Sequence, residues 1–267
     1  MRFSLPFLPR RPTVPVIRLN GVIAASGRVG SVLNDAGLAT TIERAFARGR
    51  PVAVALVINS PGGSPVQSAL IAARIRRLAD EHKLPVHAFV EDIAASGGYW
   101  LASTADSIWV DDTSIVGSIG VISAGFGFPD FLARYGVERR VHTAGKSKSL
   151  LDPFRPEKPE DVARLRGILD ELHRVFIAQV QTRRGERLDA TETLFEGDVW
   201  VGAQAVRVGL ADGVGHLVPK MKELFGDKVR LVPFAQRRPL FARLGAAAAD
   251  AALERIEDRA LWARYGM

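Results

Sequence analysis

Cysteine is absent from the 267 residues of the chain. Its absence excludes disulfide bonds, cysteine nucleophiles and zinc sites built on thiolates. Histidine is scarce, and no histidine stands in a glycine-rich turn or beside an acid in a catalytic pattern. The five are His82, His87, His142, His173 and His216. The sequence therefore does not indicate a serine–histidine–aspartate triad.

Long apolar runs are also missing. The longest uncharged span, residues 51–73, is interrupted by NSPGGSPVQS, which a helix exposed to lipid would not tolerate. The opening MRFSLPFLPRRPTVP is basic, but Pro6 and Pro9 break its apolar stretch, so it does not read as a signal peptide. We expect no transmembrane segment, and a cytoplasmic protein or one held at the inner membrane surface by charge.

Basic residues exceed acidic ones by 36 to 29, which gives a net charge of +7. Much of the excess lies in short arginine clusters, without interleaved aromatic residues and without a nucleic-acid-binding motif. A solvated basic surface is favoured over nucleic-acid binding. Weak attraction to anionic lipid stays open as a second interpretation.

Two strand–turn–helix units dominate the first half of the chain. VAVALVINS, from Val52, is continuously apolar and predicts a strand buried on both faces. Ser64 followed by Pro65 is typical of a helix start, and we expect that helix to run to about His82. A second strand, residues 85–90, precedes a helix predicted over residues 93–102. Strands alternating with helices predict an α/β fold.

The remaining pattern predicts a single main domain. We assign residues 1–13 to an N-terminal extension, 14–233 to the domain and 234–267 to a helical tail. Further strands are expected at 16–23, 107–110, 137–143 and 228–233, and further helices at 38–47, 129–136, 159–183 and 239–265. A loop is expected at 30–34, a strand and turn at 114–123, and a short helical hairpin at 197–215.

One serine stands in an unusual setting, IAASGGYWLA, in which Ser96 is flanked by alanines and glycines. Small neighbours permit tight helix packing, but they also give a substrate carbonyl access to the hydroxyl and to nearby N–H groups. Gly62 and Gly63 follow the preceding strand, and turns after consecutive parallel strands meet at one sheet edge. No glycine stands two residues before Ser96, so the sequence does not match a nucleophile elbow.

A base for this serine is harder to find. A lysine serves when burial or a neighbouring charge lowers its pKa. The stretch TAGKSKSLLDPF, residues 143–154, offers Lys146 and Lys148. Spacing alone does not choose between them, and two loop lysines are usually solvated.

Four ordered motifs carry a resemblance to the signal peptide peptidase A family, the Ser-Lys peptidases with a Clp-protease/crotonase fold. They are INSPGGS (58–64), AASGGYWLA (94–102), VGSIGV (116–121) and AGKSKS…DPF (144–154), within a match from Val14 to Val218. The resemblance implies a repeated ββα superhelical core, with a C-terminal helical extension. It also implies peptide substrates that are short, extended and mainly apolar, such as signal-peptide remnants.

The same resemblance assigns roles to residues. It makes Ser96 the nucleophile, Lys148 the base and Ser118 the serine that orients the lysine. Gly63 and the N–H of Gly97 match the oxyanion donors, and no metal or cofactor is needed. Family members often carry Asp or another residue after the base, where this chain has Ser149.

Two further expectations follow from the resemblance. Serine and lysine of one site come from adjacent catalytic units, so a chain of this length is expected to form a ring-like homo-oligomer with shared sites. Typical members also carry a transmembrane helix before the first strand, where this sequence has only a short segment rich in proline and arginine.

Two other functions remain as alternatives. A crotonase-type enzyme would bind an acyl-CoA thioester, but the carboxylate pattern of hydratases is not recognisable. A catalytically silent oligomeric scaffold would not need Ser96 and Lys148, both of which are present.

Overall fold

The computed structural model describes residues 11–25, 32–145, 148–235 and 259–267. These residues form two compact units. The first lies within Met1–Ile119 and Ala178–Met267, and the second within Gly120–Ile177. Each unit is described by itself.

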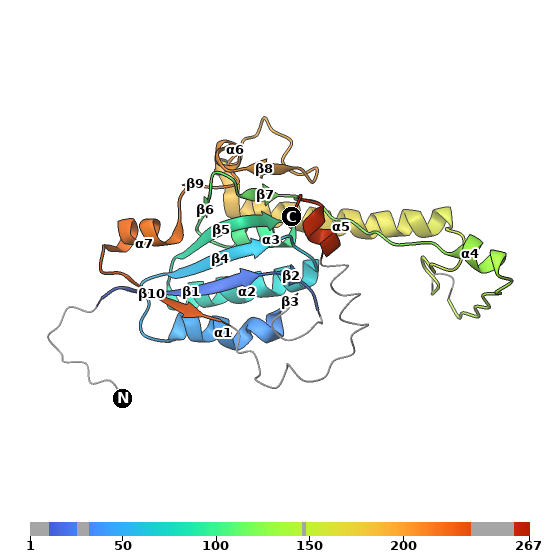
Figure 1. The fold of residues 1–267 in the computed structure, drawn as a ribbon, viewed down its shortest axis with the longest axis horizontal. Helices are drawn as coiled ribbons and strands as arrows, with labels where there is room; N and C mark the ends of the chain where they lie inside the picture. The colour runs from blue at the N-terminus through green and yellow to red at the C-terminus, as the bar shows by residue number, and fades with distance from the viewer. Residues whose placement is uncertain (1–10, 26–31, 146–147, 236–258) are drawn as a thin grey trace. The chain divides into compact units, whose positions relative to one another are not determined.

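A mainly parallel sheet forms the centre of the first unit (Figure 1). Its path runs β10 (Arg230–Phe234), β1 (Thr13–Asn20), β4 (Val54–Ser60), β5 (Val86–Ala95), β6 (Ser107–Val110) and β9 (Gly213–Val214). Two strands lie off this path: β7 (Ile115–Gly117) pairs parallel with the end of β5, and β8 (Val199–Val201) pairs antiparallel with β7. The mixed α/β fold predicted by the alternating pattern is confirmed.

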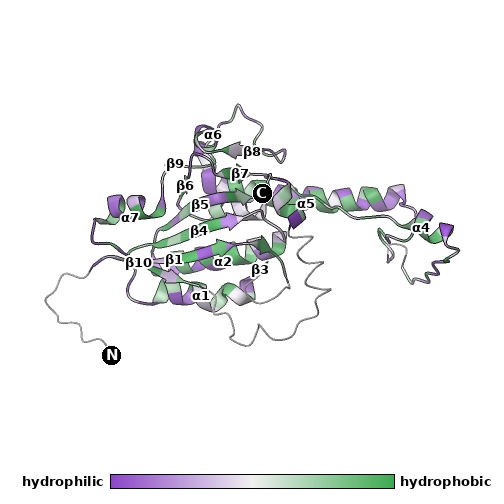
Figure 2. Ribbon diagram, in the orientation of Figure 1, coloured by the Kyte–Doolittle hydropathy of each residue, from purple (hydrophilic) through white to green (hydrophobic). Residues whose placement is uncertain are grey.

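Both faces of the central strand are buried, as its continuous apolar run predicts. Ala55 and Val57 belong to a core cluster with Met221 of α7 (Leu217–Phe225). The alternate residues Leu56 and Ile58 point to the opposite face and are fully buried too. Figure 2 shows hydrophobic colouring along most of β4. This burial fixes the position of the β4 carboxyl end, where the candidate site begins.

Helices α1 (Asp35–Ala47), α2 (Pro65–His82) and α3 (Gly97–Ser103) pack in succession, α1 on α2 and α2 on α3. The predicted start of α2 is confirmed, because the Ser64 Oγ accepts a hydrogen bond from the Gln67 N–H at 3.4 Å and Pro65 occupies the first turn. The helix ends at His82, and its C-cap residue Lys83 adopts the left-handed conformation.

The second unit contains α4 (Pro129–Arg134) and the first part of α5 (Pro159–Arg184), which continues into the first unit. The predicted strand at 137–143 is wrong, since these residues, most of them exposed, pair with no strand. Several aromatic side chains of this unit are exposed, and Phe126 is 83% accessible. Apolar sequence here does not mark a buried core.

Other boundaries depart from prediction. Residues 93–95 belong to β5 rather than to a helix, because Ala94 pairs with both Ser60 of β4 and Val116 of β7. The predicted hairpin at 197–215 consists of β8, α6 (Ala203–Arg207) and β9. The loop expected at 30–34 contains β3 (Val32–Leu33), which pairs with β2 (Val22–Ile23).

Three short elements in the last third of the chain remain to be compared with the prediction. The pattern missed α7, and the turn η1 (Gly185–Arg187) follows α5. Of the predicted helix at 239–265, residues 236–258 lie outside the described part, and residues 259–263 are helical. No helix within the described ranges has both the length and the apolarity to cross a membrane.

Candidate active site

Ser96 lies on a sharp turn between β5 and α3, with φ of 51° and ψ of −122°. Few residues other than glycine adopt this region, so the conformation is strained. Two hydrogen bonds hold it: the Ser96 N–H donates to the Gly117 carbonyl at 2.8 Å, and the Ser96 carbonyl accepts from the Trp100 N–H at 3.0 Å. The sequence argued against a nucleophile elbow, but the structure places Ser96 on a strand-to-helix turn of that kind.

The two glycine-containing turns are neighbours, as predicted. A Cβ built on Gly62 would lie 2.8 Å from the Ser96 Cβ, the Gly97 nitrogen and the Ala95 carbonyl oxygen. The backbone of Gly62 therefore touches the turn that holds Ser96. Pairing of Ser60 with Ala94 at the ends of β4 and β5 explains the approach.

Two backbone N–H groups at this edge, those of Gly63 and Gly97, lie next to the Ser96 turn. Ile23 bonds to the Gly62 carbonyl and to the Ser64 N–H, at 2.8 and 2.7 Å, so the N–H of Gly63 between them faces away from Ile23. Gly97 is the first residue of α3, where N–H groups have no intrahelical acceptor. Within the described residues, neither N–H donates to a backbone carbonyl.

Ser118 lies beside Ser96. Gly117 of β7 pairs with Ala95 of β5, so the next residue of each strand emerges at the same edge. Ser118 also has a positive φ, 50°, and its N–H donates to the Asp198 carbonyl at 2.6 Å. The Tyr265 hydroxyl donates to the Ser118 Oγ at 3.1 Å. No pattern in the sequence links Tyr265 to this site.

The predicted base lies in the second unit. Lys148 is exposed and lies in a turn, where its backbone N–H donates to the Gly145 carbonyl at 3.2 Å. Lys146 lies outside the described residues. Because Ser96 belongs to the first unit, the pairing of Ser96 with Lys148 stays a prediction.

Buried polar side chains that the sequence analysis missed support the site. The Ser60 Oγ accepts from the Gly62 N–H at 3.2 Å, and the Ser68 Oγ donates to the Ser64 carbonyl at 2.9 Å. A Cβ on Gly97 would clash with the Ser68 hydroxyl, which shows how closely α2 approaches α3. Such serines give no signal in a single sequence, because serine is common in turns and helix starts.

The helix that follows Ser96, α3, is hydrogen-bonded to the segment 209–212. The Tyr99 hydroxyl donates to the Leu210 carbonyl at 2.8 Å, and burial raises the pKa of this phenol. Arg184, also buried, donates to the Gly209 carbonyl and to the Asp212 carboxylate, both at 2.8 Å. The Tyr99 contact holds α3 against the segment 209–212, and the Arg184 contacts hold that segment against the end of α5.

Comparison with known proteins identifies the class of protein to which this chain belongs. The model of peptidase family S49 matches residues 79–226, more than half of the chain. "Serine protease SPPA, chloroplastic" of Arabidopsis thaliana is 31% identical over 224 residues, 81% of this chain and 32% of that protein. The chain belongs to peptidase family S49, a family of serine proteases.

Two further similarities extend over nearly the whole chain. A Brucella melitensis protein named "Na(+)/H(+) antiporter NhaA" is 44% identical over all of this chain, which spans 40% of that protein. Because the match leaves the rest of the Brucella protein uncovered, the antiporter name applies to that protein and is not carried over to this chain. The structure of 1510-N, a membrane-bound stomatin-specific protease with a substrate peptide, covers 93% of this chain and 99% of its own, with a TM-score of 0.53 and 16% identity. That likeness shows the fold.

Proposed function

We propose that this chain is a serine endopeptidase with Ser96 as nucleophile and Lys148 as general base. The observation that carries the proposal is the strained Ser96 turn, packed against Gly62 and flanked by the N–H groups of Gly63 and Gly97. Its substrates are short, extended, mainly apolar peptides such as signal-peptide remnants. Neither a metal nor a cofactor takes part.

The reaction follows from these roles. Neutral Lys148 accepts the Ser96 hydroxyl proton while the Ser96 Oγ bonds to the scissile carbonyl carbon. The resulting oxyanion is held by the N–H groups of Gly63 and Gly97, each worth about 3 kcal/mol in the transition state. Lys148 then gives its proton to the leaving amine as the C–N bond breaks. Water, activated by Lys148, hydrolyses the acyl-enzyme.

Ser118 takes the positioning role in this scheme. Its hydroxyl emerges beside Ser96 at the paired ends of β5 and β7, where it can orient the lysine ammonium or amine. Because the base must be neutral to accept a proton, the rate is expected to rise toward alkaline pH. A rate maximum at acidic pH would contradict a lysine base.

The finer fold and assembly belong to the same proposal. The fold is of the Clp-protease/crotonase kind, a repeated ββα superhelix with a C-terminal helical extension, within a single domain of residues 14–233. The protomers form a ring in which Ser96 and Lys148 of one site come from neighbouring copies. The exposed aromatic residues of the second unit, among them Phe126, Phe131 and Tyr135, support an interface there. Contact with a membrane is peripheral.

Hydrolysis of a pool of apolar peptides, read by mass spectrometry, tests the proposal. Ser96→Ala and Lys148→Ala should each abolish cleavage, and the wild-type cut sites should give the specificity. Lys158→Ala, which removes another lysine of the second unit, is the matched control and should cleave like the wild type. Cleavage that survives Ser96→Ala would contradict the nucleophile.

A further inference from the structure

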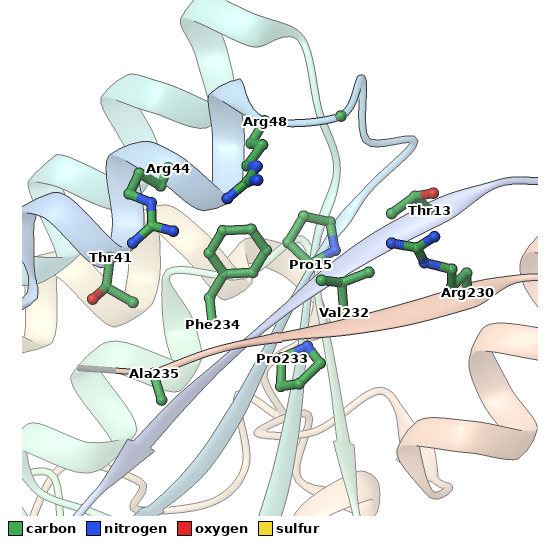
Figure 3. Close-up of a pocket in the computed structure, with 11 residues that line it drawn as sticks. Thr13, Pro15, Thr41, Arg44, Arg48, Arg230, Val232, Pro233, Phe234 and Ala235 are labelled. Atoms are coloured by element: carbon green, nitrogen blue, oxygen red, sulfur yellow. The ribbon is translucent and has the colours of Figure 1, made fainter. Parts of the chain in front are cut away.

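A pocket of about 750 Å³ opens at the β10 edge of the sheet, between β10, β1 and the C-terminal end of α1 (Figure 3). The described residues that line it all belong to the first unit, and none of them belongs to the turns that hold Ser96. The volume falls within the range of small-molecule sites, about 300 to 1,000 Å³. The pocket is therefore a separate feature of the molecule.

Among the described residues that line this pocket, three are arginines and none is acidic. Arg44 and Arg48 lie one helical turn apart at the end of α1 and project toward Phe234, whereas Arg230 comes from β10 (Figure 3). A concave surface with one sign of charge concentrates ions of the opposite sign. The arrangement favours an anionic ligand.

The charges of these arginines are not neutralised within the described residues. Arg44, Arg48 and Arg230 form no ion pair there, although ten other arginines do. The acid next to Arg44 in sequence, Glu43, instead binds Arg74 at 2.8 Å. Three guanidinium groups without a carboxylate match a ligand that carries about two negative charges, as a phosphate monoester does near neutral pH.

Apart from the three arginines and two threonines, the described residues that line the pocket are apolar. Pro15, Val232 and Phe234 form one wall, and the Arg44 guanidinium lies 6.0 Å from the centre of the Phe234 ring. Phe234 thereby holds Arg44 at the pocket. A guanidinium presents paired N–H donors that fit phosphate oxygens in a bidentate manner. An apolar group joined to the phosphate would pack on this wall.

We propose that this pocket binds a phosphate monoester with an apolar substituent. Arg44 and Arg48 bind the phosphate, Arg230 adds the third positive charge, and the substituent packs against Pro15, Val232 and Phe234. Two sources offer this chemistry: a soluble organic phosphate, or the headgroup of phosphatidic acid in a lipid surface.

Isothermal titration with phenyl phosphate tests the site in solution. The full-length protein should bind it, and Arg48→Gln should weaken binding about 10-fold through the loss of a charge-assisted contact. Arg44→Gln should have a similar effect. Inorganic phosphate, which lacks the apolar group, should bind more weakly than phenyl phosphate.

Arg50→Gln is the matched control, because Arg50 is exposed, lies two residues from Arg48 and does not line the pocket. It removes the same charge and should leave the affinity unchanged. Far-ultraviolet circular dichroism of each variant checks the fold. Equal weakening by Arg50→Gln and Arg48→Gln would show attraction to net charge alone and overturn the proposal.

Co-sedimentation with phosphatidylcholine vesicles, with and without phosphatidic acid, separates the two sources. Binding that needs phosphatidic acid and is lost in Arg48→Gln but kept in Arg50→Gln identifies the lipid headgroup. Phenyl phosphate binding with the same dependence, and no vesicle binding, identifies a soluble ester. Failure of the wild type to bind either probe would overturn the proposal, and none of these outcomes depends on peptidase activity.

Discussion

At the scale of single residues, Gly62 has no room for a side chain. Its φ is +101°, and an added Cβ would press on Ser96, Gly97 and Ala95. The position therefore links the geometry of the β4 turn to that of the nucleophile. A substitution there affects both the stability and the position of Ser96.

Gly62→Ala is expected to lower the free energy of unfolding by about 2 to 4 kcal/mol, from backbone strain plus overpacking. Peptidase activity should fall by at least about 10-fold, since small displacements of reacting groups are costly. Gly49→Ala is the control: its φ is +84°, but its Cβ would meet nothing within 4 Å. It should lose about 1 kcal/mol and keep activity. Denaturant unfolding and peptide assays give both readouts, and equal losses in the two variants would contradict the packing argument.

Much of the candidate site could be predicted from sequence because its residues sit in compact motifs. Ser96, Gly97, Gly62 and Gly63 follow strands, and parallel strands bring such turns to one edge. The strained φ of Ser96 could not be predicted, since Ala94 stands where the familiar elbow pattern has glycine. The Tyr265 contact joins residues 147 positions apart, and no local pattern encodes it.

At the scale of elements, α1 and α2 are joined by a bidentate ion pair. The Arg74 guanidinium donates to both Asp35 carboxylate oxygens, at 2.7 and 2.8 Å, and lowers the pKa of Asp35. A carboxyl whose pKa is lower in the folded state stabilises the fold above its unfolded pKa, about 3.9. That contribution disappears as pH falls through the folded pKa.

Asp35→Asn should therefore cost about 1 to 2 kcal/mol of unfolding free energy at neutral pH. The difference from the wild type should shrink in strongly acidic solution, where Asp35 is protonated in both states. Glu81→Gln, which breaks the exposed pair with Arg77, is the comparison and should cost about 0.3 kcal/mol. Urea unfolding across pH measures both, and a difference that grows in acid would contradict the sign.

Elements with strong local signals could be predicted closely. Helix α2 has a serine cap and an N-terminal proline, and β6 is bounded by turns. The end of β5 was mistaken for helix because AASGG is small and unbranched, and only its pairing with β4 and β7 makes it a strand. The two-residue strands β2, β3 and β9 are likewise products of pairing, which a window of sequence does not reveal.

At the scale of the whole molecule, the proposed dyad needs two units. Ser96 belongs to the first and Lys148 to the second, and the second unit exposes Phe126, Phe131 and Tyr135 at 83%, 59% and 67%. Apolar exposure of this kind often marks an interaction surface. Sharing of sites between protomers would account for both features.

Mixing of two inactive variants tests the sharing. Ser96→Ala and Lys148→Ala protomers, unfolded and refolded together in equal amounts, should regain about a quarter of the wild-type rate, because random assembly pairs an intact serine with an intact lysine in that fraction of sites. Each variant refolded alone should stay inactive. A mixture as inactive as its components would contradict a site shared between protomers.

The proposed peptidase activity depends on the attack of Ser96 on the scissile carbonyl. The measurement that tests it most directly is the mass of the protein after brief reaction with an activated ester of an apolar acyl group, followed by peptide mapping of the modified residue. We expect one acyl group per active site, attached to Ser96 and absent in Ser96→Ala. The label should be retained in Ser114→Ala, which alters a buried serine of the same unit. An acyl group on another residue, or equal labelling of Ser96→Ala, would contradict it.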